Sequence, residues 1–290
     1  MLEHCLESLV KQTRMPNEVI VVDNSSTDNA KKVILSFRKK LPIRYIVEKQ
    51  IGIPYARNKG IKSSHGTLLL MLDDDCEADK FWVERMEKAQ KKYKKAWVIQ
   101  GKTNSVPDTK PYSLLAEFNR SLSMRNYAKT IPPLSHFFSQ NFKDEIRLLT
   151  CDTKNFSIKT SYFKEYKLSF DEHFYRGSDT DFGRQIVQKN GLIMFCPSIQ
   201  VSHWERSTLL HFLEQRWHIG RTGARIADKW KRSIAIKMSA LNKFLAFLLF
   251  CKTFNLWRNF PVLTAVLFLD KLYYLNGWFF EKRILSLQKQ

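Results

Sequence analysis

The chain has 290 residues, of which 44% are hydrophobic and 13% are aromatic, so it is long enough and apolar enough to bury a sizeable core. Charged residues make up 26%, and this composition excludes an intrinsically disordered chain. The formal net charge of +20 predicts an anionic partner, which would be a nucleic acid, an anionic membrane surface or a phosphate-rich substrate.

Helices and strands are expected to alternate over residues 1–106. Apolar residues at helical spacing in "LEHCLESLVKQ" predict a helix, and four apolar segments predict strands: "VIVV", "IRYIVEK", "GTLLLML" and "KAWVIQGKTNSV". Between these strands, helices are expected in "AKKVILSFRKK", "GIPYARNKGIKSS" and "DKFWVERMEKAQKKY". The alternation predicts an α/β fold with a Rossmann-like, mostly parallel sheet flanked by helices.

The chain becomes less regular after this half. Residues 107–147 are rich in proline and predict a mostly helical insertion. "LLTCDTKNFSIKTSYFKEY" then predicts a strand, a turn and a helix. "GSDTDFGRQIVQKNG" predicts a polar loop followed by a helix, and "LIMFCPSIQVSHW" predicts a further strand.

Residues 211–290 predict a helical appendage in which aromatic and basic residues alternate. Its longest uncharged run, Asn259 to Leu269, is shorter than the roughly 18 to 20 residues that a spanning helix needs. Three interpretations stay open: a helical pair packed on the protein's own core, helices lying in the headgroup region of an anionic membrane, or a membrane-spanning segment. Scattered cysteines and an N-terminus unlike a signal peptide predict a cytoplasmic protein, peripheral at the inner face of the cell membrane.

Acidic residues follow two of the predicted strands. Asp23 ends the first of these strands, and Asp73, Asp74 and Asp75 end the third. Two carboxylates about 4 Å apart repel by roughly 4 kcal/mol at an effective dielectric constant of about 20, so solvent or a cation must offset this cluster. In open α/β sheets ligands bind at the carboxyl ends of strands, and carboxylates there suit Mg²⁺ or Mn²⁺. The alternatives are an Asx-turn at Asp23 and a solvated acidic turn that caps the next helix.

Four segments together resemble family 2 glycosyltransferases, which have the GT-A fold: "VIVVDNSSTD", "GIPYARNKGI", "LLLMLDDDC" and "GSDTDFGRQI". The resemblance covers residues 1–210 and implies a nucleotide-sugar-binding half, 1–106, and an acceptor and catalytic half, 107–210. It implies an enzyme that transfers a sugar from a nucleotide-diphosphate donor to an acceptor hydroxyl with inversion, usually with Mn²⁺ or Mg²⁺.

The resemblance also implies roles for individual residues. On the donor side, Asp23 would hold the nucleotide base, Arg57 would lie near the phosphates and Asp73 would face the ribose. Asp75 would bind the metal, and His203 in "VSHW" resembles a histidine that completes the metal or diphosphate site.

On the acceptor side, Asp179 would be the general base, and Asp181 would orient the loop or a neighbouring group. By themselves, these two acids also suit the positive end of a helix. Trp217 in "EQRW" is either an acceptor platform or a packing residue. Leu213 replaces the first Gln of the Q-x-x-R-W motif, which argues against a processive polymerase, and Ser178 replaces an acid that usually precedes the base.

One departure concerns the start of the chain. Family members normally begin with a strand and a Pro-Thr turn, whereas this chain starts at the following helix. We therefore expect unpaired backbone and an exposed groove in the sheet. The origin would be a start codon placed too late or a truncated gene. If the chain is native as written, we expect low donor affinity or no activity.

The predicted function is metal-dependent sugar transfer to a glycan or lipid-linked acceptor in cell-surface polysaccharide or glycolipid synthesis. The alternatives are a degenerate protein that binds sugar nucleotides without turnover, or a basic protein that binds nucleic acid or an anionic surface. No RRM, KH or helix-turn-helix pattern is present and the positive charge is spread along the chain, so no nucleic-acid partner is expected.

Overall fold

The computed structural model describes residues 1–106, 111, 113–116, 118–119, 146–174, 176–204, 208–231, 240–253 and 255–288. The chain forms two compact units, one of residues 1–104 and 143–204 and the other of residues 105–142 and 205–290. The helical insertion expected at 107–147 lies almost wholly outside the described residues. Residues 105–142 belong to the second unit, whereas the sequence interpretation placed residues from 107 onward in the acceptor half.

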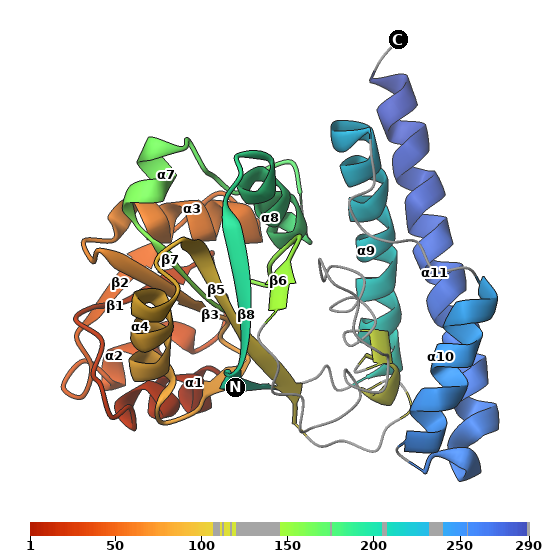
Figure 1. Cartoon of the computed structure of the whole chain (residues 1–290), viewed down its shortest axis with the longest axis horizontal. Coiled ribbons are helices and arrows are strands. Elements are labelled where there is room, and N and C mark those ends of the chain that lie inside the picture. The colour runs from red at the N-terminus through yellow and green to blue at the C-terminus, as the bar shows by residue number, and fades with distance from the viewer. Residues whose placement is uncertain are drawn as a thin grey trace. The chain divides into compact units, whose positions relative to one another are not determined.

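The first unit is built of strands and helices in the predicted order (Figure 1). Its strands are β1 (Val19–Asp23), β2 (Ile43–Val47), β3 (Leu68–Leu72), β4 (Cys76–Ala78), β5 (Ala96–Ser105), β6 (Ile146–Leu148), β7 (Asn155–Lys159) and β8 (Leu192–His203). Its helices are α1 (Leu2–Val10), α2 (Ala30–Ser36), α3 (Ile53–Ser63), α4 (Trp82–Lys92), α7 (Ser161–Glu165) and α8 (Ser178–Gln188). The α/β class is therefore confirmed. Sequence patterns missed β4 and β6, which are too short to show a period.

The larger sheet has the strand order β3-β7-β5-β8-β4, with β6 also paired to β8. Strand β7 runs antiparallel to both β3 and β5, so these two strands point in the same direction. β1 and β2 form a separate parallel pair. The expected parallel relationship is thus found between β1 and β2 and between β3 and β5, while β7 runs the other way between the latter two.

The sheet is divided between β1 and β3. Within the described part of the chain, β1 pairs only with β2, and β3 pairs only with β7. Side chains along both strands are half-buried, although their apolar sequences predicted strands covered on both faces. The described strands therefore form two separate sheets, one of β1 and β2 and one that contains β3.

The hydrophobic core of the first unit joins three helices to the sheet. Leu6 of α1, Ile34 of α2 and Met86 of α4 are buried together with Ile99 of β5 and Ile199 of β8. Because these helices come from the amphipathic segments of the sequence, their apolar faces anchor the strands whose ends carry the acidic residues.

The second unit contains α9 (Leu209–Trp230), α10 (Ala240–Thr253), the short helix η1 (Trp257–Asn259) and α11 (Phe260–Leu287). Helices α9 and α11 meet at glycines. A Cβ atom added to Gly220 would lie 2.0 Å from the carbonyl oxygen of Tyr274, and one added to Gly277 would lie 2.0 Å from that of Trp217. The two backbones are therefore in direct contact, which only glycine permits at these positions.

Both acidic residues of α11 point into this helix pair. Asp270 is 4% exposed and pairs with Arg216, while Glu281 is fully buried and pairs with Arg221 at 2.6 Å and with Arg225. Buried carboxylates need such partners, because an unpaired buried charge is strongly destabilising.

The outward face of α11 is apolar and cationic. Val262, Phe268, Leu272, Leu275 and Phe279 are exposed at helical spacing, and the neighbouring basic residues Lys271, Lys282 and Arg283 are also exposed. Among the helices in the described ranges, none combines the length and apolarity needed to cross a membrane.

Candidate active site

The three consecutive aspartates form a turn between β3 and β4. The Cys76 N–H donates a hydrogen bond to the carbonyl oxygen of Asp73 at 3.1 Å, which closes this turn. Asp73 contacts Arg57, Asp75 contacts His203, and Asp74 is exposed to solvent. Two of the three carboxylates thus have cationic or hydrogen-bonding partners, while partial desolvation and the charges of Asp75 and Asp73 raise the pKa of Asp74.

The pair of strands β4 and β8 brings Asp75 to His203. Cys76 is the register partner of His203, and the Trp204 N–H donates to the carbonyl oxygen of Asp75 at 2.9 Å. As a result, Nε2 of His203 lies 3.3 Å from Oδ2 of Asp75. Burial opposes ionisation of Asp75, but His203 and the charge of Lys154 outweigh it and lower the pKa of this carboxyl.

The donor atoms at this point fit a hard divalent cation. Asp75, Cys76 and His203 can each place one ligand atom within 4.8 Å of the others. Burial, followed by the charges of Asp75 and Asp73, raises the pKa of the Cys76 thiol, so it stays protonated and is a poor ligand. Carboxylate oxygen and imidazole nitrogen remain, and Mn²⁺ or Mg²⁺ would complete its coordination with water and substrate phosphate.

Arg57 connects the aspartate turn to α8. From α3, its Nη2 lies 3.3 Å from Oδ1 of Asp73 and its Nη1 donates to the Ser178 hydroxyl at 3.4 Å. Its guanidinium also lies over the ring of Phe170, 5.4 Å from the centroid. The predicted donor-side residues Arg57 and Asp73 are therefore in direct contact with each other.

Asp179 lies in the first turn of α8 and is half-buried. Its Oδ1 accepts a hydrogen bond from the Thr180 N–H at 2.8 Å. Burial and then the charge of Asp152 raise the pKa of Asp179, while Arg57 and Lys154 oppose that rise. A carboxyl with a raised pKa is well suited to accept a proton near neutral pH.

The two other acceptor-side candidates, Asp181 and Trp217, contact neighbouring side chains of the fold. Asp181 is fully buried, and its Oδ2 accepts a hydrogen bond from Gln185 at 2.9 Å. Trp217 lies in α9 of the second unit, where its ring packs 5.4 Å from that of Phe280 and beneath the guanidinium of Arg221. Their roles at an acceptor stay predictions.

Asp23 is held at the carboxyl end of β1. Its Oδ2 accepts a hydrogen bond from the Tyr45 hydroxyl at 2.5 Å, and its Oδ1 accepts one from the Ser26 N–H at 2.8 Å. Partial burial opposes ionisation, but these hydrogen bonds outweigh it and lower the pKa of Asp23. The residue therefore presents an ionised acceptor group, as expected for contact with a base or a hydroxyl.

Sequence patterns missed two charged residues of the site, Asp152 and Lys154. They precede β7, whose register with β3 pairs Asn155 with Leu72, so continuing the antiparallel ladder carries them toward the aspartate turn. Lys154 Nζ lies 3.0 Å from Oδ2 of Asp152. The sequence marked Asp152 and Lys154 only by their position directly before the partly apolar segment "NFSIK".

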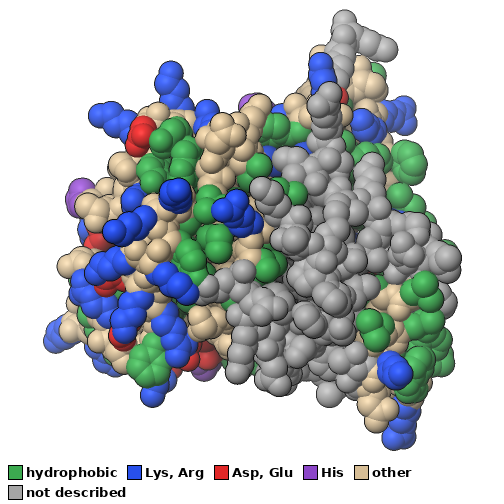
Figure 2. Space-filling model, viewed as in Figure 1, with side chains coloured by type: hydrophobic (Ala, Val, Ile, Leu, Met, Phe, Trp, Pro, Cys, Tyr) green, Lys and Arg blue, Asp and Glu red, His purple; other side chains and the backbone are tan. Residues whose placement is uncertain are grey.

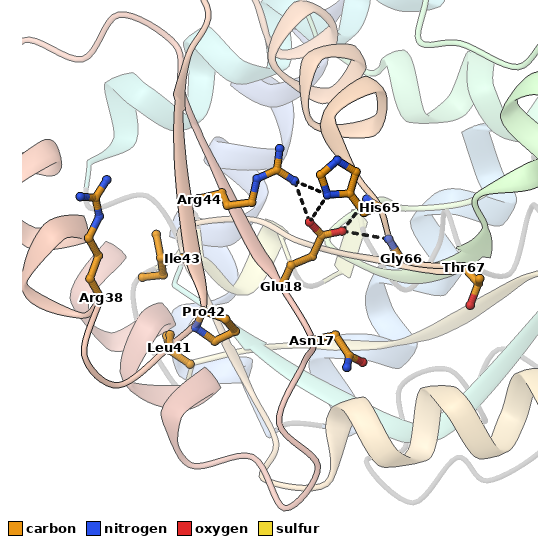
Figure 3. A pocket seen from close by; sticks show the side chains of 10 residues that line it. All are labelled: Asn17, Glu18, Arg38, Leu41, Pro42, Ile43, Arg44, His65, Gly66 and Thr67. Carbon is orange, nitrogen blue, oxygen red and sulfur yellow. Dashed lines mark hydrogen bonds and ion pairs between the residues drawn. The ribbon is translucent and has the colours of Figure 1, made fainter.

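A cavity of about 910 Å³ lies at the opposite ends of the strands (Figure 3). It opens near the amino ends of β1, β2 and β3, where Glu18 pairs with Arg44 at 2.8 Å and accepts hydrogen bonds from the backbone N–H groups of His65 and Gly66. These contacts tie the three strand starts together. The cavity is therefore separate from the acidic site at the carboxyl ends.

Comparison with known sequences places the chain in a family. The sequence profile described as glycosyl transferase family 2 matches residues 1–167. The chain is 36% identical over 88 residues to the glycosyltransferase AglE of Haloferax volcanii, covering 29% of each chain. It is 26% identical over 220 residues to the chondroitin synthase of Pasteurella multocida, covering 65% of this chain and 22% of the synthase. The chain thus spans less than a third of these relatives.

Solved structures share the fold. The Staphylococcus aureus protein TarS, residues 1–349 in complex with UDP-GlcNAc, matches with a TM-score of 0.54 and 19% identity over 90% of this chain and 69% of its own. GalNAc-T7 with UDP, GalNAc and Mn²⁺ matches with a TM-score of 0.52 and 17% identity over 76% of this chain and 47% of its own. These likenesses confirm the GT-A fold, and the profile match shows that the chain belongs to glycosyl transferase family 2.

Proposed function

We propose that this chain transfers a sugar from a nucleotide-diphosphate donor to an acceptor hydroxyl, with inversion and with Mn²⁺ or Mg²⁺. The observation that carries this proposal is that Arg57 contacts both Asp73, in the turn that also holds the candidate metal ligand Asp75, and Ser178, which directly precedes the candidate base Asp179. The charge of Lys154 lowers the pKa of Asp75 and opposes the raised pKa of Asp179, so both carboxyls lie within its electrostatic reach.

The roles follow from the chemistry of the groups. Asp179 takes the proton of the acceptor hydroxyl as its oxygen bonds to the anomeric carbon and the bond from that carbon to the diphosphate breaks. Asp75 and His203 would hold the cation, which would stabilise negative charge on the diphosphate as a Lewis acid. Arg57 and Asp73 orient the donor, and Asp23 binds its base.

The two similar solved structures suggest which sugar donors to test first. TarS was solved with UDP-GlcNAc and GalNAc-T7 with UDP, so UDP-sugars head the panel. Turnover is measured with and without Mn²⁺ for the wild type, Asp75→Ala and Asp179→Asn. Loss of transfer in each case supports the proposal, and activity indifferent to all three changes contradicts it.

Binding without turnover is the second candidate, because β1 and β3 are not joined by a described strand. Stabilisation of the wild type by UDP or GDP in a thermal-shift assay, with no transfer or donor hydrolysis across the panel, would favour this alternative. A steeply salt-dependent affinity for RNA or DNA with no nucleotide-sugar binding would instead favour a basic binding protein.

We also propose that the acceptor is a glycan or a lipid-linked molecule, and that α11 lies on the anionic inner face of the cell membrane. Its outward face carries exposed aromatic residues together with lysines and an arginine. Its two acids, Asp270 and Glu281, instead pair with arginines of α9. Such a face suits apolar burial combined with attraction to anionic lipids.

Vesicle co-sedimentation tests this surface. The wild type is expected to bind vesicles containing phosphatidylglycerol and not pure phosphatidylcholine. Phe268→Ser combined with Phe279→Ser should abolish binding, while Ile51→Ser, which removes an exposed apolar side chain of the first unit, should not. Equal binding by the double variant and the wild type would contradict the membrane role of α11.

A further inference from the structure

The segment that carries Asp152 and Lys154 is fixed by a buried polar network. Asn155 is fully buried, and its amide donates to the carbonyl oxygen of Lys102 and accepts from the indole of Trp82 at 2.8 Å. Gln100, also buried, accepts a hydrogen bond from the Asp152 N–H at 2.7 Å. Satisfied networks of this kind set positions tightly, so this segment is held against the core rather than free at the surface.

Within this segment, Lys154 and Asp152 form a partly buried ion pair. Their side chains are 22% and 24% exposed, and Nζ lies 3.0 Å from Oδ2. Partial burial weakens screening by salt, so the ammonium charge acts on nearby groups more strongly than a surface lysine would. The register of β7 with β3 pairs Asn155 with Leu72, so Lys154, one residue before β7, comes beside the start of the aspartate turn.

The two cations of the site have different surroundings. Arg57 contacts Asp73 and Ser178 and is directed at the aspartate turn and the start of α8. Lys154 comes from another part of the chain, directly before β7, and pairs with Asp152. A donor diphosphate adds negative charge where Asp75, Asp152 and Asp179 already gather, and an ammonium group is a compact point charge that suits a phosphate oxygen.

We propose that Lys154 binds the diphosphate of the nucleotide-sugar donor beside the metal pair, and that Asp152 holds its ammonium in place. This inference rests on the proposed function and assigns a diphosphate-binding residue outside the four segments that carry the family resemblance. As the bond to the anomeric carbon breaks, its electron pair moves to the diphosphate oxygen, and the ammonium stabilises that charge without transferring a proton.

Binding of inorganic pyrophosphate with Mn²⁺, measured by isothermal titration calorimetry, tests the proposal without knowing the sugar or the base. Lys154→Met keeps the aliphatic stem and should weaken binding by about 10- to 100-fold, the usual effect of losing a hydrogen bond to a charged group. Lys154→Arg should restore part of the affinity. Lys159→Ala is the matched control, because Lys159 stands at the other end of β7, opposite Leu68.

The outcomes separate this inference from the proposed function. Thermal unfolding first establishes that each variant is folded, and Lys154→Gln replaces Lys154→Met if the latter is not. If the Lys154 variants bind pyrophosphate as tightly as the wild type, the inference is wrong but the proposed function stands. The same holds if Lys159→Ala loses as much pyrophosphate affinity as Lys154→Met does. A wild-type protein that binds neither Mn²⁺–pyrophosphate nor any nucleotide sugar overturns both.

Discussion

Nε2 of His203 lies 3.3 Å from Oδ2 of Asp75, although the two residues come from distant parts of the sequence. They meet because β4 pairs with β8 and places Cys76 opposite His203. The nearby thiol is kept protonated by burial and by neighbouring carboxylates, which raise the pKa of Cys76. The site therefore offers a cation one carboxylate oxygen and one imidazole nitrogen, and the thiol beside them is a soft donor that suits Mn²⁺ poorly.

The first prediction concerns metal affinity. Asp75→Asn and His203→Gln should each weaken Mn²⁺ binding by about tenfold or more, since even residues that only support metal ligands contribute 10- to 100-fold. Cys76→Ser should bind Mn²⁺ as the wild type does. Titration calorimetry or electron paramagnetic resonance of Mn²⁺ measures the three affinities, and a loss confined to Cys76→Ser would refute the assignment.

The second prediction combines activity with stability at Asp179. Asp179→Asn should lower turnover by about 10² to 10⁴, the usual contribution of a positioned base. The same variant should melt at a higher temperature at neutral pH. The folded-state pKa of Asp179 is raised, so the native state binds more protons than the unfolded state, and stability falls as pH rises from the unfolded pKa through the folded pKa.

The pH dependence provides the check for Asp179. The gain in melting temperature should be present at pH 7 and should shrink toward pH 4, where the wild-type carboxyl is increasingly protonated. The acid limb of the activity profile should lie above the pH expected for an ordinary aspartate. A variant that loses activity but is destabilised at pH 7 would point to a structural role instead.

The third prediction concerns the hydrogen bond from Tyr45 to Asp23. The folded-state pKa of Asp23 is lowered, so its ionisation stabilises the native state above the unfolded pKa, and this stability is lost as pH falls through the folded pKa. Tyr45→Phe should therefore lower the melting temperature at pH 7, and this effect should shrink as pH falls below the ordinary pKa range of an aspartate. Tyr93→Phe, just after α4, is the control, and a pH-independent effect of Tyr45→Phe would contradict this account.

The fourth prediction concerns the glycine contact between α9 and α11. Gly220→Ala would place Cβ 2.0 Å from the carbonyl oxygen of Tyr274, so the helices must separate. We expect a loss of about 1 to 3 kcal/mol in the free energy of unfolding, as for other overpacked sites. Gly223→Ala meets only side-chain atoms of Tyr274 and Trp278, at 2.8 Å or more, and should be better tolerated. Chemical denaturation compares the two, and equal effects would refute the role of backbone contact.

Much of the first unit could be predicted because its signals are local. An apolar run such as that of β3 is followed within a few residues by the acids that end it, and the amphipathic spacing of α1 and α4 appears within each segment. The family resemblance added roles to Asp75 and Asp179 from short segments of the same kind.

Other features depend on residues that are far apart in sequence. Strand β4 has only three residues, so no local pattern showed its pairing with β8, which brings Asp75 to His203; only the family resemblance implied one metal site for both residues. The register of β7 with β3 brings Lys154 to the site, and no pattern near Lys154 distinguishes it from a solvated lysine. Nothing in the sequence near Asp270 or Glu281 identifies their partners, which are arginines of α9.

By itself, the sequence determined the order and type of the longer elements of the first unit and the acids that stand at the ends of β1 and β3. This was possible because burial periodicity and strand-end chemistry act over a few neighbouring residues. Only the tertiary structure decided which cation meets which carboxylate and which face of α11 remains outside. Those choices follow from strand register and helix packing, which are set by the burial of the whole chain and not by any one segment of it.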